Sequence, residues 1–87
     1  MANDTLLEFP CDFPIKVMGA ATDDFRSLVL GIITRHFGAP VEGSIEERPS
    51  GGGKYLGITV TVHAESKAQI DAAYVELTSC SQVLVAL

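Results

Sequence analysis

Residues 55–63 read YLGITVTVH, and this stretch decides the fold class. Leucine, isoleucine and two valines occupy every second position, and smaller or more polar residues lie between them. Strict alternation of this kind is typical of a β-strand that buries one face and leaves the other face more polar. We therefore expect a strand from an antiparallel sheet with one covered face.

Two helices are predicted, one on each side of this strand in the chain. Thr22 is placed to cap the first helix, and Gly38 to end it. Ser66 and Gln69 form a capping box for the second helix. In each predicted helix, residues that recur at helical spacing form one continuous stripe along a single face. The stripe of the first helix contains Phe25, Leu28, Val29, Ile32, Ile33 and His36, and that of the second contains Ile70, Ala73, Tyr74 and Leu77.

Three further strands complete the pattern. One is predicted over Phe13–Met18 and ended by Gly19, a polar edge strand over Ser44–Arg48, and the last over Gln82–Leu87. The resulting β-α-β-β-α-β order predicts an α+β, ferredoxin-like sandwich with sheet order 4-1-3-2 and both helices on one face. We expect residues 1–10 to form an N-terminal arm and residues 11–87 a single domain.

Composition excludes several classes of partner. The 87 residues carry a net charge of −5, which disfavours binding to nucleic acid or to anionic membrane surfaces. No signal peptide or membrane-spanning stretch is visible, so we expect a cytoplasmic protein. Cys11 and Cys80 fall at opposite ends of the predicted sheet, too far apart for an intramolecular disulfide.

The sequence also lacks a recognisable catalytic or metal-binding constellation. No histidine is predicted near the serines, which lie in caps and loops. His36 and His63 are expected at the same end as Cys11, but their spacing fits no known zinc pattern. The turn Gly51–Gly53 is followed by Lys54 and then tyrosine, which fails the phosphate-loop pattern. We therefore expect no enzymatic activity, cofactor or metal.

The open face of the sheet is the strongest candidate for binding. We expect Met18, Leu84 and Ala86 to lie on it beside Thr59 and Thr61. The last strand, VLVAL, is apolar on both faces, which is typical of a strand covered from outside. The cover could be a second copy of the chain, another protein or the N-terminal arm. The alternative is an ordinary half-exposed edge strand.

Several short motifs resemble a known family. The opening LLEFP at residues 6–10, Phe13 and KVMG at residues 16–19 resemble the start of the YbeD-like family of uncharacterised bacterial proteins. Arg35-His36, Ser50 with GKY at residues 53–55, and the closing VLVAL are similar too, whereas the run of three glycines departs from the expected pattern.

The resemblance implies a ferredoxin-like fold similar to ACT domains, which are small regulatory modules of amino-acid metabolism, and it implies no established activity. By analogy with ACT domains, a small effector would bind near Met18, Gly19 and Ala20 across a dimer interface.

Two functional hypotheses remain. The first is a non-enzymatic module that binds a protein, or a second copy of itself, through the open sheet face. The alternative is an ACT-like sensor of a small metabolite that regulates a partner in trans, a hypothesis that rests on fold analogy.

Overall fold

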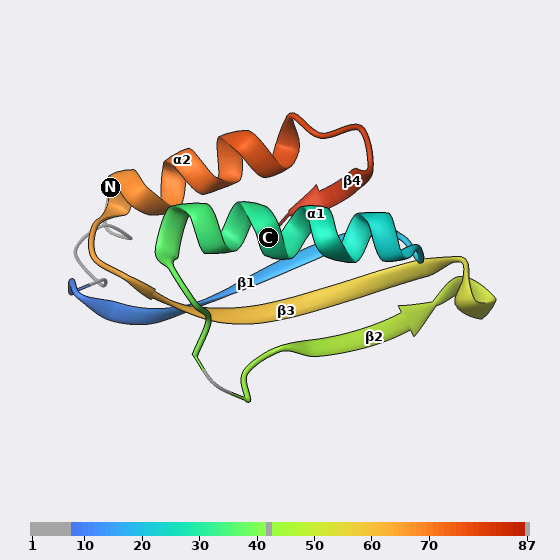
Figure 1. Cartoon of the computed structure of the whole chain (residues 1–87), viewed down its shortest axis with the longest axis horizontal. Coiled ribbons are helices and arrows are strands. Elements are labelled where there is room, and N and C mark those ends of the chain that lie inside the picture. Colours follow the sequence, from blue (N-terminus) through green and yellow to red (C-terminus); the bar gives the residue numbers. More distant parts are fainter. Residues whose placement is uncertain (1–7, 42, 87) are drawn as a thin grey trace.

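The computed structural model describes residues 8–41 and 43–86. Its main elements follow the predicted β-α-β-β-α-β order, and a 3-10 turn, η2, joins the second strand to the third (Figure 1). Of the predicted arm, residues 8–10 are described and precede the first strand, while residues 1–7 and Leu87 lie outside the described part. The elements are β1 (Cys11–Ala20), α1 (Asp23–Phe37), β2 (Glu46–Ser50), η2 (Gly51–Gly53), β3 (Tyr55–Ala64), α2 (Lys67–Thr78) and β4 (Val83–Ala86).

The four strands form one antiparallel sheet in the order β2-β3-β1-β4. This is the predicted order 4-1-3-2 read from the other edge, so the predicted topology is confirmed. The two central strands pair along ten residues, from Cys11 with Ala64 to Ala20 with Tyr55. β1 is therefore longer at both ends than the predicted Phe13–Met18, because its length is set by pairing with β3 and not by its own end residues.

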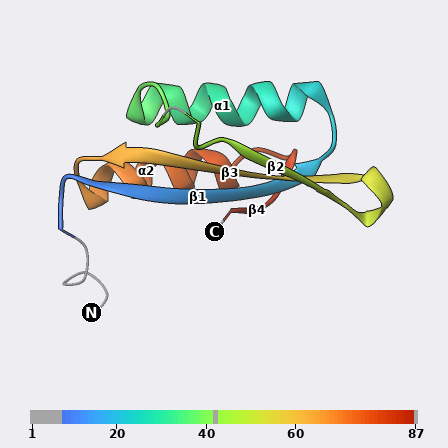
Figure 2. The same ribbon diagram turned by 90° about the horizontal axis from the view of Figure 1, so that it is seen from below.

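Both helices cover the same face of the sheet, as predicted (Figure 1). In the view turned by 90°, α1 runs along one side of the strands (Figure 2). Alternate strand residues point to the helices and are buried, and the apolar stripes of the two helices meet them. The largest fully buried side chains are Ile15, Val17, Phe25, Val29, Ile32, Ile33, Ile58, Val60, Val62 and Leu77.

The helix caps explain where the helices begin. The Thr22 hydroxyl accepts a hydrogen bond from the Phe25 amide at 3.0 Å, and the Ser66 hydroxyl accepts one from the Gln69 amide at 3.2 Å. The Gln69 side chain in turn accepts a hydrogen bond from the Glu65 amide at 2.7 Å, one residue before the Ser66 amide that a capping box predicts as the donor.

Neither helix in the described residues is long and apolar enough to span a membrane.

One predicted orientation in β4 is wrong. Ala86 pairs with Val17 and packs against the core, so it does not lie on the open face. The cause is an irregularity between Met18 and Gly19, where Val85 pairs with Met18 and Val83 pairs with Gly19. A bulge of this kind shifts the alternation by one residue, which simple period-two counting does not reveal. Val85 therefore takes the position predicted for Ala86.

Gly19 allows the first turn of α1 to approach the sheet. A β-carbon built on Gly19 would lie 2.3 Å from the Phe25 ring and 2.3 Å from the Gln82 carbonyl oxygen. Phe25 is completely buried, so its ring has no free space in which to move away. A side chain at position 19 is therefore incompatible with the observed core.

We predict opposite effects for two glycine-to-alanine substitutions. Gly19→Ala should lower the free energy of unfolding by about 3 kcal/mol or more, because it overpacks the core against Phe25 and backbone. Gly31→Ala is the matched control, since nothing lies within 4 Å of a β-carbon there and alanine should stabilise the helix by roughly 0.5–1 kcal/mol. Urea unfolding measures both changes, and a stable Gly19→Ala variant would contradict the described contact.

Candidate binding groove on the open sheet face

The strand register arranges the open face in rows. Because side chains alternate along each strand, the residues that lie between the buried positions share the uncovered face. One row contains Arg48 on β2, Gly57 on β3, Met18 on β1 and Val85 on β4. The next row contains Glu46, Thr59 and Lys16. The sheet therefore presents a compact set of apolar and charged side chains around Gly57.

A groove of about 730 Å³ follows these two rows. Gly57 lines the groove and contributes no side chain to it. A β-carbon on Gly57 would be in ordinary contact, 3.6 Å from the Arg48 carbonyl oxygen and 3.9 Å from Cε of Met18. The open-face residues that line the groove are Lys16, Met18, Glu46, Arg48, Gly57, Thr59 and Val85. Its volume is within the range of small-molecule sites in proteins.

The basic residues divide between the two sides of the sheet. On the helix side, Arg26 bonds Glu47 and Asp23, each at 2.7 Å, and these carboxylates raise the pKa of its guanidinium. The side chains of Lys16 and Arg48 in the groove, by contrast, make no hydrogen bond or ion pair to any residue in the described ranges. Their charges are therefore available to a group from outside the chain.

The structure separates the three residues predicted to bind an effector. Met18 lines the groove, but Gly19 faces the core and meets Phe25. Ala20 is exposed at the end of β1, where the following turn is tied to the hairpin by a 3.1 Å bond from the Ala21 amide to the Lys54 carbonyl. Of the three residues, Met18 alone lines the groove.

The residues predicted for the interaction face have different positions. Met18 and Thr59 line the groove. Thr61 is half-buried two positions farther along β3, and the Ser44 hydroxyl bonds its backbone. Leu84 is 58% exposed at the bulge of β4, and Ala86 faces the core as described above. The sequence prediction did not include Lys16, Glu46 and Arg48 in the interaction face. Glu46 and Arg48 reach the groove through the pairing of β2 with β3, and Lys16 through the pairing of β1 with β3.

The two histidines lie on different sides of the sheet. His63 follows the open-face alternation of β3, and its Nδ1 lies 3.3 Å from a carboxylate oxygen of Asp12. His36 belongs to α1 on the covered side, where its Nε2 lies 2.8 Å from a carboxylate oxygen of Glu76. Across residues 8–41 and 43–86, no group of three His, Cys, Asp or Glu residues could hold a metal ion. Cys11 and Cys80 are both free thiols.

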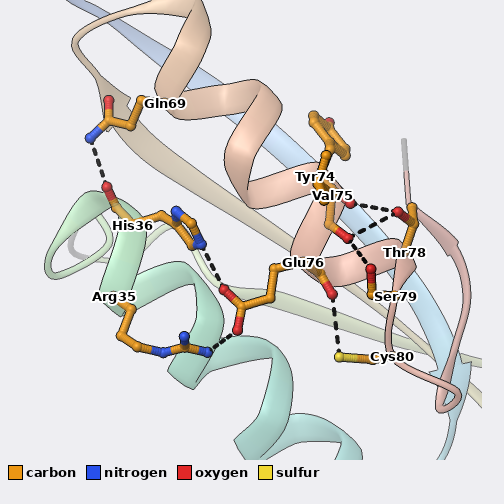
Figure 3. A network of polar contacts seen from close by, with 9 residues as sticks. All are labelled: Arg35, His36, Gln69, Tyr74, Val75, Glu76, Thr78, Ser79 and Cys80. Atoms are coloured by element: carbon orange, nitrogen blue, oxygen red, sulfur yellow. Dashed lines mark hydrogen bonds and ion pairs between the residues drawn. The ribbon is translucent and has the colours of Figure 1, made fainter.

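The contacts of His36 belong to a polar network that joins the two helices (Figure 3). The Glu76 carboxylate on α2 accepts from Arg35 and contacts His36, both in the last turn of α1. Gln69 donates its side-chain amide to the His36 carbonyl oxygen at 2.7 Å. The bond from Arg35, followed by that from His36, holds the pKa of Glu76 below its ordinary value. These groups satisfy one another, and the arrangement ties the end of α1 to α2.

A protein-family comparison accounts for almost the whole chain. Residues 4–87 match the family described as "Protein of unknown function (DUF493)". The chain belongs to the DUF493 family. This assignment confirms the resemblance predicted from the opening motifs.

Close relatives of this DUF493 protein occur in several bacteria under the name UPF0250 protein. The relative from Paraburkholderia phytofirmans is 46% identical over 86 residues, covering 98% of this chain and 96% of its own. One from Ralstonia nicotianae is 45% identical over 85 residues, covering 98% and 88%. One from Neisseria meningitidis is 43% identical over 83 residues, covering 95% and 91%. These family names state no ligand or activity.

We predict that Glu76 stabilises this DUF493 protein in a pH-dependent way. The folded-state pKa of Glu76 lies below its ordinary value of 4.5. The contribution of the carboxylate to folding stability is therefore complete above pH 4.5, and it is lost as the pH falls through the lowered pKa. Glu76→Gln should therefore unfold at a lower urea concentration than the wild type at neutral pH. The difference should close at acidic pH, and a difference that is the same at both pH values would contradict the role given to the carboxylate.

Proposed function

We propose that this chain is a non-enzymatic binding module that engages a protein surface through the open face of its sheet. One observation carries the proposal: the groove of about 730 Å³ lies on the face that neither helix covers. The helix-bearing face is occupied by the core. The groove on the other face combines exposed apolar side chains with charged side chains that have no partner among the described residues.

The chemical character of the groove supports recognition of a protein. Met18 and Val85 are 39% and 45% exposed and provide apolar contact area, while Lys16 and Arg48 provide charge at its margins. An apolar centre with a polar rim is the usual anatomy of a protein interface. The unbranched, polarizable side chain of Met18 can adapt to different partner shapes.

Several hydroxyl and thiol groups make structural contacts, which supports a non-enzymatic role. The Ser44 hydroxyl bonds the backbone of Thr61, and the hydroxyls of Ser66 and Ser79 bond backbone at the ends of α2. The Cys80 thiol donates to the Glu76 carbonyl oxygen at 3.3 Å. A nucleophile in an active site needs a neighbouring base and an orienting group.

The metabolite-sensor hypothesis has less geometric support. Its predicted site at the Gly19 turn is filled on the core side by the Phe25 ring and the Gln82 carbonyl oxygen. A small effector would instead have to use the groove, where Met18 is its single contact among the three predicted residues. We therefore place protein binding at the open face first and the sensor second.

Site-specific photocrosslinking tests the proposed face in cells. A benzophenone amino acid at Thr59, inside the groove, should give a discrete crosslinked protein. The same probe at Val75, which is exposed on α2, should give none and serves as the control. Gly57→Phe adds a ring where a β-carbon is tolerated, so it should fill the groove and remove the Thr59 adduct without unfolding the chain.

Two results would overturn the proposal. Equal crosslinking from Thr59 and Val75 would show that the open face is not preferred. A Thr59 adduct that persists in a folded Gly57→Phe variant would show that the groove is not the contact. Circular dichroism of the purified variants establishes that they are folded.

A further inference from the structure

The charges on the open face change sign from one edge of the groove to the other. Lys16 on β1 and Glu46 on β2 lie in the same cross-strand row, with uncharged Thr59 of β3 between them. Both charged residues are exposed, and neither has an ion-pair partner within the described residues. A positive and a negative group placed on opposite sides of a central strand form a pattern that is complementary to itself.

We propose that two copies of this chain pack open face to open face, with Lys16 of each copy paired to Glu46 of the other. The two copies are related by a two-fold axis that runs parallel to β3 between the two sheets. This axis places β1 of each copy over β2 of the other. Each contact therefore occurs twice, as in any self-complementary two-fold interface. The inference rests on the proposed function and names a second copy as the occupant of the face.

The register favours this axis over one that crosses the strands through the same row. A crossing axis there would place Lys16 opposite Lys16 of the second copy and Glu46 opposite Glu46, which is repulsive. The axis along β3 instead gives two opposite-charge pairs per dimer. Face-to-face sheets lie about 10 Å apart, a gap that a lysine and a glutamate extended toward each other can close.

The neighbouring row fits the same arrangement. Arg48 would lie over Met18 of the second copy, where its aliphatic stem can cover an apolar side chain that is exposed in the single chain. Gly57 and Thr59 of β3 lie near the axis, so the centre of the interface carries no like charges. The hollow at Gly57 gives room for the side chains of the opposite copy.

The available area suits a modest dimer. β1 and β3 have ten residues each, β2 has five and β4 has four. At about 3.3 Å per residue and about 4.8 Å per strand, the face therefore has on the order of 450 Å² of projected area. A standard interface buries about 800 Å² from each partner. We therefore expect association at micromolar concentration that weakens as salt screens the ion pairs.

Charge reversal tests the pairing. In sedimentation equilibrium the wild type should be a dimer, whereas Lys16→Glu alone and Glu46→Lys alone should each be monomeric, because each places like charges opposite one another. An equimolar mixture of the two variants should form a heterodimer, which native mass spectrometry identifies when one variant is isotopically labelled. Glu65→Lys makes the same charge change at an exposed residue outside the groove and should stay dimeric.

Each contrary result overturns the proposal. A monomeric wild type removes the second copy as occupant, and the Thr59 crosslink then decides independently whether another protein uses the face. A wild-type dimer that neither reversal weakens, or single variants that fail to associate when mixed, would show that Lys16 and Glu46 do not form the contact. Thermal unfolding of both variants establishes that they are folded in the assay.

Discussion

The antiparallel pairing of β1 with β3 is the constraint on which the rest of the structure depends. It aligns ten residues of each strand and thereby assigns every side chain to one of two faces. Ile15 and Val17 share the covered face with Val60 and Ile58, and the two helices complete the core there. A slip of one residue would exchange the two faces, which makes this register costly to change.

The same pairing creates the candidate binding face. By placing Met18 beside Gly57 it opens a hollow, and by placing Lys16 beside Thr59 it brings a cation to the edge of that hollow. The chain is acidic overall, and Arg26 and Arg35 are neutralised by carboxylates on the helix side. Lys16 and Arg48 are thus cations on the open face that the described residues leave unpaired, and they are available for contact with another molecule. Alternate residues of the paired strands thus build the core on one face of the sheet and the candidate binding groove on the other.

Local sequence patterns predicted the elements, the topology and the covered face. Alternation in residues 55–63, helical spacing after Thr22 and the capping residue Ser66 each act over a few neighbouring positions, so they can be read without knowing the partner strand. The groove was predicted only in part, because Glu46 and Arg48 reach it through the register of β2 with β3. Ala86 was misplaced because a bulge depends on the pairing of two distant strands and leaves no mark in period-two alternation.

The central claim is that one face of the sheet stabilises the fold while the other is free to bind. Thr59 and Val60 are neighbours on opposite faces, so exchanging their residue types tests this claim most directly. Val60 is 1% exposed, and Val60→Thr should lower the free energy of unfolding by about 1–3 kcal/mol, because it buries a hydroxyl in the core. Thr59→Val makes the reverse chemical change, a hydroxyl replaced by a methyl group of similar size. It should alter the free energy of unfolding by less than about 0.5 kcal/mol. Urea unfolding that gave equal losses for the two variants would contradict a sheet with one covered and one open face.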